Sequence, residues 1–212
     1  MDKKSPQCAK CPLKTCYRNP KSKRPSFCPM DVYPEIVKNS LEFYKNDELS
    51  RSLHYHSTIV EREGYGHWTR IREFIELCKK LGIRKVGIAF CIGLSEESKE
   101  LCNILEDWGF EVYSVVCKCG SFDKREIGVE EDEKLKPNSH ESMCNPILQA
   151  MLLNHVETEI NVIVGLCVGH DSVFMRYSKS PVVCIIAKDR VTGHNPAVPL
   201  YAKHYFSKLL KP

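Results

Sequence analysis

The sequence predicts an α/β fold: a four-stranded parallel sheet of the Rossmann or flavodoxin-like kind with flanking helices, preceded by a small cysteine-rich segment. Strand-like and helix-like segments alternate from residue 85 onward. Two of the strands, in VIVGLCV and VVCIIA, are apolar almost throughout, as strands buried on both faces are. Cysteine also falls at or just after the end of nearly every predicted strand.

The composition is that of an ordinary globular protein. The chain has 212 residues, of which 42% are hydrophobic and 27% charged. Residues 1–4 are basic but no apolar run follows, so no secretory signal is expected. The most apolar stretch, 160–168, is too short to span a bilayer. We therefore expect a cytoplasmic protein with no membrane partner, in which the 12 cysteines are ligands, catalysts or core residues rather than disulfides. The oligomeric state has no sequence signature.

We expect three parts: a metal-binding module over 1–30, a helical segment over 31–82 and the α/β domain over 83–212. The first part has no continuous helix because prolines interrupt it, at Pro6, Pro12, Pro20, Pro25 and Pro29. A bound metal would replace the missing hydrophobic core. Its many lysines and arginines either solvate it and offset its thiolates or contact a nucleic acid. The second alternative is the weaker one, because no aromatic-and-basic pattern of a nucleic-acid module accompanies them.

The helical segment begins at Pro34, a favoured first helical residue, and apolar residues recur at helical spacing to residue 63. Asn46 and Asp47 are expected to divide it into two helices. A third helix is predicted from about 67 to 81, with Gly82 as its carboxyl-terminal cap.

The predicted strands are 85–91, 111–117, 161–167 and 182–188. Helices are predicted from Ser95 as an N-cap with Trp108 in the buried stripe, then over 146–155, after Asp171, and over 197–209. The polar segment 118–143 is long enough to be either functional or partly disordered.

The first thirty residues hold the pattern C-x2-C-x4-C-x11-C, formed by Cys8, Cys11, Cys16 and Cys28. A C-x2-C pair lets one turn offer two sulfurs to one metal, and four thiolates can hold tetrahedral zinc or an iron–sulfur cubane. The x4 and x11 gaps fit neither a standard zinc finger nor a standard ferredoxin run, so the spacing leaves both metals open.

A second cysteine set is predicted at the edge of the sheet: Cys91, Cys117, Cys119, Cys144 and Cys167. Right-handed crossovers bring the carboxyl ends of parallel strands to one edge, where ligands bind. Cys117 can point into the core because strand residues alternate faces, so Cys119, past the strand end, is the better ligand. Cys144 precedes a helix N-terminus, which favours a thiolate. Cys78, Cys102 and Cys184 are expected in the core.

Polar residues follow the last two strands. We expect His170, Lys188 and Arg190 to position an anionic substrate or relay protons, whereas Asp171 can equally serve as a helix cap. The chain has no Walker loop, no G-x-G-x-x-G after a strand and no G-x-S-x-G, so ATP, NAD and serine-hydrolase functions lack support.

The strings FCIGL, CKCG, MCNPILQA, GLCVGHDSVF and KDRVTGHNP, with CAKCPLKTCYR and FCP before them, resemble a family of small cysteine-rich microbial proteins of unknown function described as metal-binding. The resemblance covers nearly the whole chain and implies a metal without naming it. The cysteine arrangement more distantly resembles that of thiouracil desulfidases, which use a [4Fe-4S] cluster held by three cysteines with one iron open to a substrate sulfur.

Two centres are therefore expected, and the second, held by Cys91, Cys119, Cys144 and Cys167 or by three of these, would act on a small, sulfur-containing substrate. We expect it to be an iron–sulfur cluster supporting non-redox sulfur transfer or desulfuration. A zinc-binding or redox-sensing module is the alternative, and a nucleic-acid-associated zinc protein is a third, weaker one.

Overall fold

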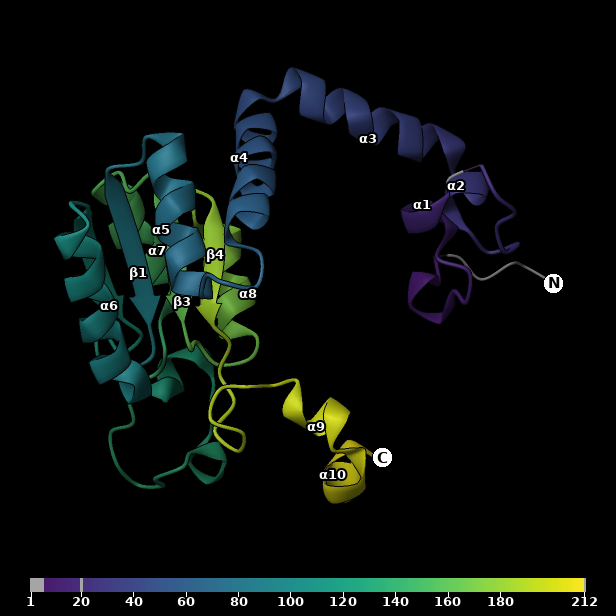
Figure 1. The fold of residues 1–212 in the computed structure, drawn as a ribbon. Coiled ribbons are helices and arrows are strands. Elements are labelled where there is room, and N and C mark those ends of the chain that lie inside the picture. Colours follow the sequence, from purple (N-terminus) through teal and green to yellow (C-terminus); the bar gives the residue numbers. More distant parts are fainter. Residues whose placement is uncertain (1–5, 20, 212) are drawn as a thin grey trace. The chain divides into compact units, whose positions relative to one another are not determined.

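Four parallel strands form one sheet in the computed structural model, which describes residues 6–19 and 21–211 (Figure 1). The strands are β1 (Lys85–Phe90), β2 (Glu111–Val116), β3 (Ile160–Val164) and β4 (Val182–Ile186). Their order is β2-β1-β3-β4, and every neighbouring pair is parallel. This is the flavodoxin-like order, so the predicted sheet is confirmed. The direction of strand addition reverses between β1 and β3, which makes that position the topological switch point.

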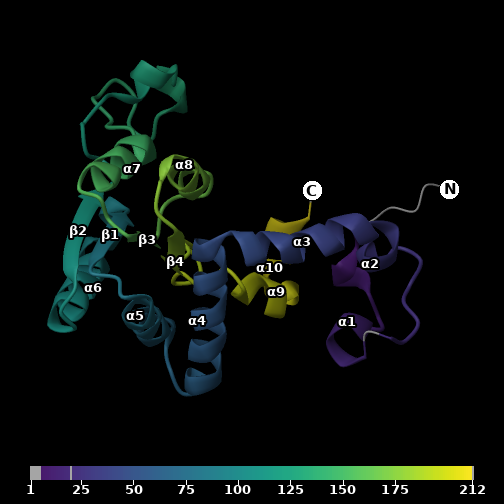
Figure 2. The same ribbon diagram turned by 90° about the horizontal axis from the view of Figure 1, so that it is seen from above.

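Helices cover both faces of the sheet. Figure 2 shows α5 (Arg70–Leu81) and α6 (Ser95–Asp107) on one face, and α7 (Pro146–His155) and α8 (His170–Tyr177) on the other. The remaining helices are α1 (Thr15–Arg18), α2 (Pro29–Val32), α3 (Pro34–Asn46), α4 (Glu48–Gly64), α9 (Val198–Tyr201) and α10 (Lys203–Leu210). Because helices cover both faces, every residue of β3 is buried, as its apolar sequence predicts.

The hydrophobic core lies on both sides of this sheet. Each flanking helix buries one apolar stripe against it, and the largest buried side chains include Ile75 of α5, Leu105 of α6, Leu153 of α7 and Phe174 of α8. The packing fixes the helices and thereby the loops at the carboxyl edge of the strands.

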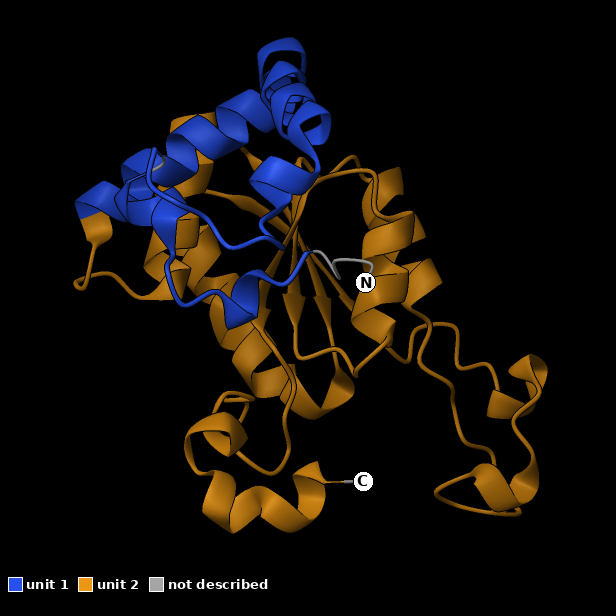
Figure 3. Ribbon diagram, turned by 90° about the vertical axis from the view of Figure 1, so that its right-hand side faces the viewer, with its two compact units in different colours: residues 1–63 blue, residues 64–212 orange. Residues whose placement is uncertain are grey.

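The chain divides into two compact units, Met1–Glu63 and Gly64–Pro212 (Figure 3). The predicted helical segment 31–82 is thus shared between them, and α5 belongs to the unit that contains the sheet. The basic residues 1–4 and Pro20, which the sequence assigns to the amino-terminal module, lie outside the described residues.

Several helix boundaries follow from local sequence. Asn46 ends α3 and Glu48 begins α4, so the predicted break is confirmed. Gly82 ends α5 with φ +70°, the left-handed conformation that glycine adopts most readily. The side chain of Asn145 caps α7 by accepting a hydrogen bond from the Leu148 N–H at 3.0 Å.

Two local predictions are wrong. Ser95 is the first residue of α6 rather than its N-cap, because the 3-10 turn Ile92–Leu94 runs directly into the helix, and its hydroxyl donates instead to the Ile92 carbonyl. Trp108 is 39% exposed rather than buried. Its ring is covered by cations from α5, with the Arg72 guanidinium 4.4 Å and the Lys79 ammonium 5.0 Å from its centre.

The strands also end one to three residues before the predicted positions. In β3 the reason is Gly165, whose φ of +61° turns the chain out of the extended conformation. Among the described helices, none combines the length and apolar character needed to cross a membrane.

Candidate metal centre at the sheet edge

The strand register brings Cys91 and Cys117 to the same level. Phe90 pairs with Val116 in the neighbouring strand, and each cysteine is the next residue along its chain. The Cys117 N–H donates to the Phe90 carbonyl at 2.8 Å, and the Cys91 N–H donates to the Val164 carbonyl of β3 at 3.1 Å. The ladder therefore extends one residue past the strands and fixes both cysteine backbones.

Cys144 reaches the same place from the long segment that follows β2. The N–H of Asn145 donates to the Cys117 carbonyl at 2.7 Å, which ties the start of α7 to the end of β2. Cys144 therefore stands at the N-terminus of α7, beside Cys117, although 26 residues separate the two cysteines along the chain.

The Cys117 sulfur lies close to those of both Cys91 and Cys144, and interaction with Cys117 is the first cause of the pKa shift at each of them. Hydrogen bonding with Cys117, and then the Lys188 ammonium, lower the pKa of Cys91. Hydrogen bonding with Cys117, and then the nearby Lys118 charge, lower the pKa of Cys144. Interaction with Cys144, then with Cys91, and then burial raise the pKa of Cys117. Cys117 is therefore the member of the three that most resists deprotonation.

The Cys117 sulfur also accepts a hydrogen bond from the Ile92 N–H at 3.4 Å. The Cys91 and Cys117 side chains are almost completely buried, whereas Cys144 is half-buried. Access to the group from solvent is therefore through the Cys144 end, where α7 begins.

Two cations connect this group to Cys167, which follows β3. The Lys188 ammonium donates to the Cys91 sulfur and lies 3.9 Å from the Cys167 sulfur, so it stands between the two. The Arg190 guanidinium lies 3.6 Å from the Cys167 sulfur. The structure thus places Lys188 and Arg190 beside cysteine sulfurs, and their role in positioning a substrate stays a prediction.

His170 is the first residue of α8 and lies close enough to Cys144 to lower the pKa of that thiol further. Its Nδ1 atom is buried and has no hydrogen-bond partner among the described residues. A buried ring nitrogen without a partner is uncommon and indicates a place where a ligand or a water completes the site.

The structure joins Cys117 rather than Cys119 to the other thiols. Cys119 is half-buried, and its N–H donates to the Val116 carbonyl at 3.1 Å in the turn after β2. The sequence-based preference for Cys119 rests on its place past the strand end. However, the turn directs the chain away from the level of Cys91 at that point, whereas Cys117 remains in the ladder.

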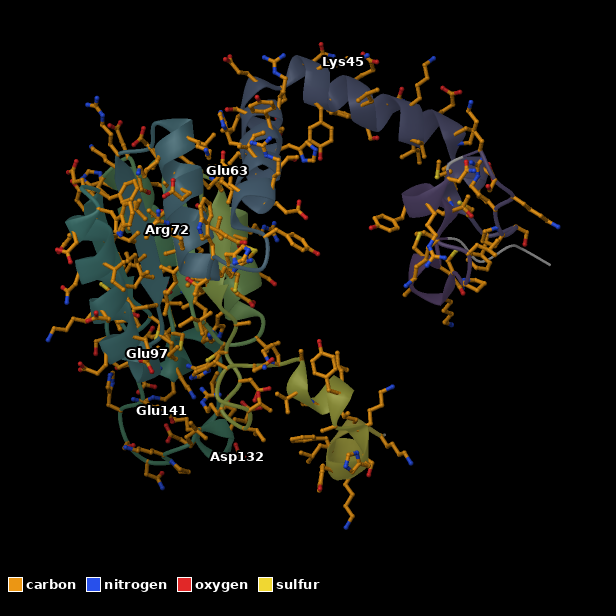
Figure 4. All side chains as sticks on the ribbon, in the orientation of Figure 1. Lys45, Glu63, Arg72, Glu97, Asp132 and Glu141 are labelled. Carbon is orange, nitrogen blue, oxygen red and sulfur yellow. The ribbon has the colours of Figure 1, made fainter. Side chains whose placement is uncertain are left out.

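The segment between Cys119 and Cys144 is ordered by a charge network. Lys134, whose side chain is fully buried, lies 3.2 Å from the Asp123 carboxylate and 2.7 Å from that of Glu131. Glu141 pairs with Lys124, and Figure 4 shows Glu141 and Asp132 in the loop toward which the strands point. This network holds the segment that delivers Cys144 to the site.

The amino-terminal cysteines gather around one pocket. The lining includes all four of them, Cys8, Cys11, Cys16 and Cys28. The Lys14 N–H donates to the Cys11 sulfur at 3.4 Å from a left-handed backbone conformation, φ +46°. Of the described residues from 6 to 50, only Thr15 is buried, so this segment lacks a hydrophobic core.

Neither set is a preformed cage: in the described part of the chain, no group of three or more His, Cys, Asp or Glu side chains is arranged around a single metal position. Of the three cysteines expected in the core, Cys78 is fully buried there, Cys102 is half-buried and packs against it, and Cys184 is half-buried in β4.

Sequence reasoning missed two residues that shape the site. Lys118 lies between the two cysteines of Cys-Lys-Cys, and its ammonium lies near Cys144 and donates to the Ser142 carbonyl at 2.6 Å. Its position directly after a predicted strand could have marked it as a residue of the sheet edge. Gln149 is fully buried and donates to the carbonyls of Phe90 and Val115. It carried no signal, because a glutamine within an apolar helix sequence is not distinctive.

Comparison with known proteins places the chain in a family. The family model described as "Protein of unknown function (DUF1847)" matches residues 28–185, a range that contains all the strand-edge cysteines but only Cys28 of the amino-terminal set. The "Uncharacterized protein MJ0455" of Methanocaldococcus jannaschii is 42% identical over 205 residues, which are 97% of this chain and 98% of that protein. No solved structure matches. The resemblance to a family of unknown function is thereby confirmed, and the chain belongs to the DUF1847 family.

Proposed function

We propose that this protein holds an iron–sulfur centre at the carboxyl edge of its sheet, with Cys91, Cys117 and Cys144 as the ligands. One observation carries the proposal: the strand register and the hydrogen bond from Asn145 to the Cys117 carbonyl bring Cys91, Cys117 and Cys144, from three separate segments of the chain, together beside the switch point. Ligands bind at this position in open parallel sheets.

The donor set fits a cluster. Soft thiolate ligands select iron–sulfur clusters, zinc or copper(I), and ligation requires deprotonated cysteine, a state already favoured at Cys91 and Cys144. No zinc ion or cluster finds a preformed set of ligands among the described residues. In a cubane each cysteine binds a different iron, so the three sulfurs would have to move apart from one another to hold a cluster.

The surrounding residues suit a small, sulfur-containing substrate. A cluster with three protein ligands would supply an iron with an open position, a Lewis acid that attracts sulfur. Lys188 donates to the Cys91 sulfur, and hydrogen bonds to ligand sulfurs tune such a centre. The buried Nδ1 of His170 is available to accept or deliver a proton, and Lys118 and Arg190 provide positive charge for an anionic group. The reaction proposed is a non-redox desulfuration.

The test is purification without oxygen, followed by iron and acid-labile sulfide analysis and an ultraviolet–visible spectrum. Wild-type protein is expected to be brown and to contain both elements. Cys117→Ser is expected to lose most of the iron, because it removes the central ligand. The matched control, Cys184→Ser, changes a half-buried cysteine in β4 and is expected to keep the iron. A colourless wild-type protein that contains only zinc would refute the proposal.

A second centre is proposed at the amino-terminal pocket, as a closed structural site with Cys8, Cys11, Cys16 and Cys28 as its four ligands. The supporting observation is that all four line one pocket in a segment that has no hydrophobic core. The Lys14 N–H donates to the Cys11 sulfur, and hydrogen bonds of this kind orient cysteine ligands in metal sites. Cys11→Ser is expected to lower the metal content without changing the spectrum of the sheet-edge centre. Unchanged metal content would contradict this assignment.

A further inference from the structure

Cys167 differs from the other cysteines of the sheet edge in its surroundings. Its sulfur is flanked by two cations, Arg190 at 3.6 Å and Lys188 at 3.9 Å, and the residue is half-buried, as Cys119 and Cys144 also are. The Lys188 ammonium stands between it and Cys91. The positive charge of Lys188 therefore separates Cys167 from Cys91 and its neighbours Cys117 and Cys144.

The backbone holds Cys167 in a fixed position. Gly165 and Gly169 on either side of it have φ of +61° and +87°, and the Cys167 carbonyl accepts hydrogen bonds from the first two N–H groups of α8 at 2.9 and 3.3 Å. A Cβ on Gly165 would meet the Leu94 side chain at 2.7 Å, so this turn is closely packed. The sulfur is thus presented at the tip of a rigid turn.

The turn that carries Arg190 is fixed as well. The Asp189 carboxylate accepts hydrogen bonds from the N–H groups of Val191 at 2.9 Å and Thr192 at 3.1 Å, and the Asp189 N–H donates to His194 Nδ1 at 3.2 Å. The turn thus fixes the backbone of Arg190, whose exposed guanidinium lies beside the Cys167 sulfur and can bind an oxyanion.

We propose that Cys167 is a nucleophilic thiol that accepts a sulfur atom from a small anionic sulfane-sulfur donor of the thiosulfate type, with Arg190 and Lys188 binding the anionic group. Two positive charges beside a half-buried sulfur attract an anionic reagent to that sulfur and stabilise an anionic leaving group. The choice of sulfur as the transferred atom rests on the proposed function, whereas the cation-flanked thiol is independent of it.

The step balances without a further reagent. The Cys167 thiolate attacks the outer sulfur of thiosulfate, and a new sulfur–sulfur bond forms on Cys167. The original sulfur–sulfur bond breaks, and its electron pair leaves with sulfite. The thiol proton has gone to water beforehand, and the products are a Cys167 persulfide and sulfite. The sulfur on Cys167 remains at the sulfane level, so no oxidant or reductant is consumed.

The experiment incubates the full chain, purified without oxygen, with thiosulfate. Sulfite release is measured, the persulfide is trapped by alkylation, and peptide mass spectrometry locates it. Wild-type protein is expected to release sulfite and form the persulfide in equal amounts, on Cys167. Cys167→Ser is expected to abolish both. Cys102→Ser, which alters a half-buried cysteine of α6, is expected to behave as wild type.

Arg190→Gln keeps the nucleophile and tests the anion-binding role. Sulfite release is expected to slow roughly tenfold, the usual size of losing one charge-assisted contact. Arg190→Lys should retain most of the rate. Equal rates of sulfite release in Arg190→Gln and wild type would overturn the anion-binding role of Arg190. A persulfide found on another cysteine, or no persulfide at all, would overturn the role of Cys167 as the nucleophile.

Iron analysis of the same samples separates this inference from the proposed function. Persulfide formation on an iron-free wild type would refute the metal centre and leave the inference standing. If Cys167→Ser retains its iron and the wild type releases no sulfite, the inference is refuted and the metal centre is left standing. Loss of iron from Cys167→Ser would make Cys167 a ligand and would overturn the inference.

Discussion

A single amide ties the two strands at the site to helix α7. The Gln149 Nε2 donates to the Phe90 carbonyl at 3.2 Å and to the Val115 carbonyl at 2.7 Å, and the residue is fully buried. Phe90 immediately precedes Cys91, and Val115 lies two residues before Cys117. Gln149 is therefore a positioning residue, which holds α7, and with it Cys144, at a fixed distance from the strand ends.

Replacing Gln149 tests this role at the residue scale. Gln149→Leu keeps the approximate side-chain volume but removes the donor, so the Val115 carbonyl loses this partner. We expect the free energy of unfolding to fall by about 1–3 kcal/mol in urea denaturation. Met151→Leu, at an exposed position of the same helix, should change it by less than about 0.5 kcal/mol. An unchanged midpoint for Gln149→Leu would show that these hydrogen bonds do not hold the site together.

At the scale of elements, the pairing of β1 with β3 depends on a missing side chain. Gly87 pairs with Asn161, which is fully buried and bonded through its amide to Ser178 at 2.8 Å and to Thr158 at 2.8 Å. A Cβ on Gly87 would lie 2.0 Å from the Asn161 Oδ1 atom and 3.0 Å from Leu153. The glycine is thus required by close approach, and its backbone conformation is ordinary.

Gly87→Ala is therefore expected to destabilise the sheet by about 1–3 kcal/mol, because the buried amide has no space into which to move. Thermal or urea unfolding measures the effect. Gly93→Ala is the control, since the nearest atoms to its Cβ lie 4.0 Å away. Equal stability of the two variants would mean that Asn161 can repack and that the fixed pairing does not depend on Gly87.

The loop between β2 and α7 depends on charge rather than on apolar packing. The Asp123 carboxylate accepts hydrogen bonds from the N–H groups of Arg125 at 3.0 Å and Glu141 at 3.1 Å, and it pairs with the buried Lys134. The backbone and side chain of Arg125, followed by these other donors, hold the pKa of Asp123 well below its usual range.

Because the folded-state pKa of Asp123 lies below the unfolded-state value, its stabilising contribution is complete above about pH 4 and is lost as the pH falls further. We expect the loop to resist proteolysis at neutral pH and to be cleaved in strong acid. Asp123→Asn is expected to be cleaved at neutral pH, while Asp132→Asn, at an exposed position in the same loop, should resist cleavage. Identical cleavage patterns would exclude Asp123 as the anchor.

At the scale of the whole molecule, the two compact units differ in what can stabilise them. The unit 64–212 has a continuous core around its sheet, whereas the described part of the chain from 6 to 50 buries only Thr15. Small segments without a core generally depend on metals, disulfides or partners. The four cysteines at its pocket make a metal the proposed stabiliser.

Loss of that metal should therefore affect one unit alone. In Cys11→Ser, the segment before α3 is expected to become sensitive to protease, while the thermal transition of the unit 64–212 remains unchanged. Limited proteolysis with mass spectrometry, together with calorimetry, distinguishes the two effects. A protease-resistant segment in the variant would mean that something other than a metal orders it.

The order of the main helices and strands is predictable from the amino-acid sequence alone. Pro34, Gly82 and Pro146 set helix boundaries through backbone conformations that each residue imposes locally, and the apolar strands indicated a sheet covered on both faces. These signals depend on neighbours along the chain and need no knowledge of the packed structure.

The tertiary structure decided which side chains meet at the edge of that sheet. Cys117 stays in the strand ladder beside Cys91 and is tied to the residue after Cys144, Lys188 stands between Cys91 and Cys167, and Trp108 lies under the cations of α5. Each outcome depends on how the chain turns in the one or two residues after a strand or helix and on what packs against it from distant segments. No local preference encodes that geometry, because it is fixed only when the register and the helix packing are complete.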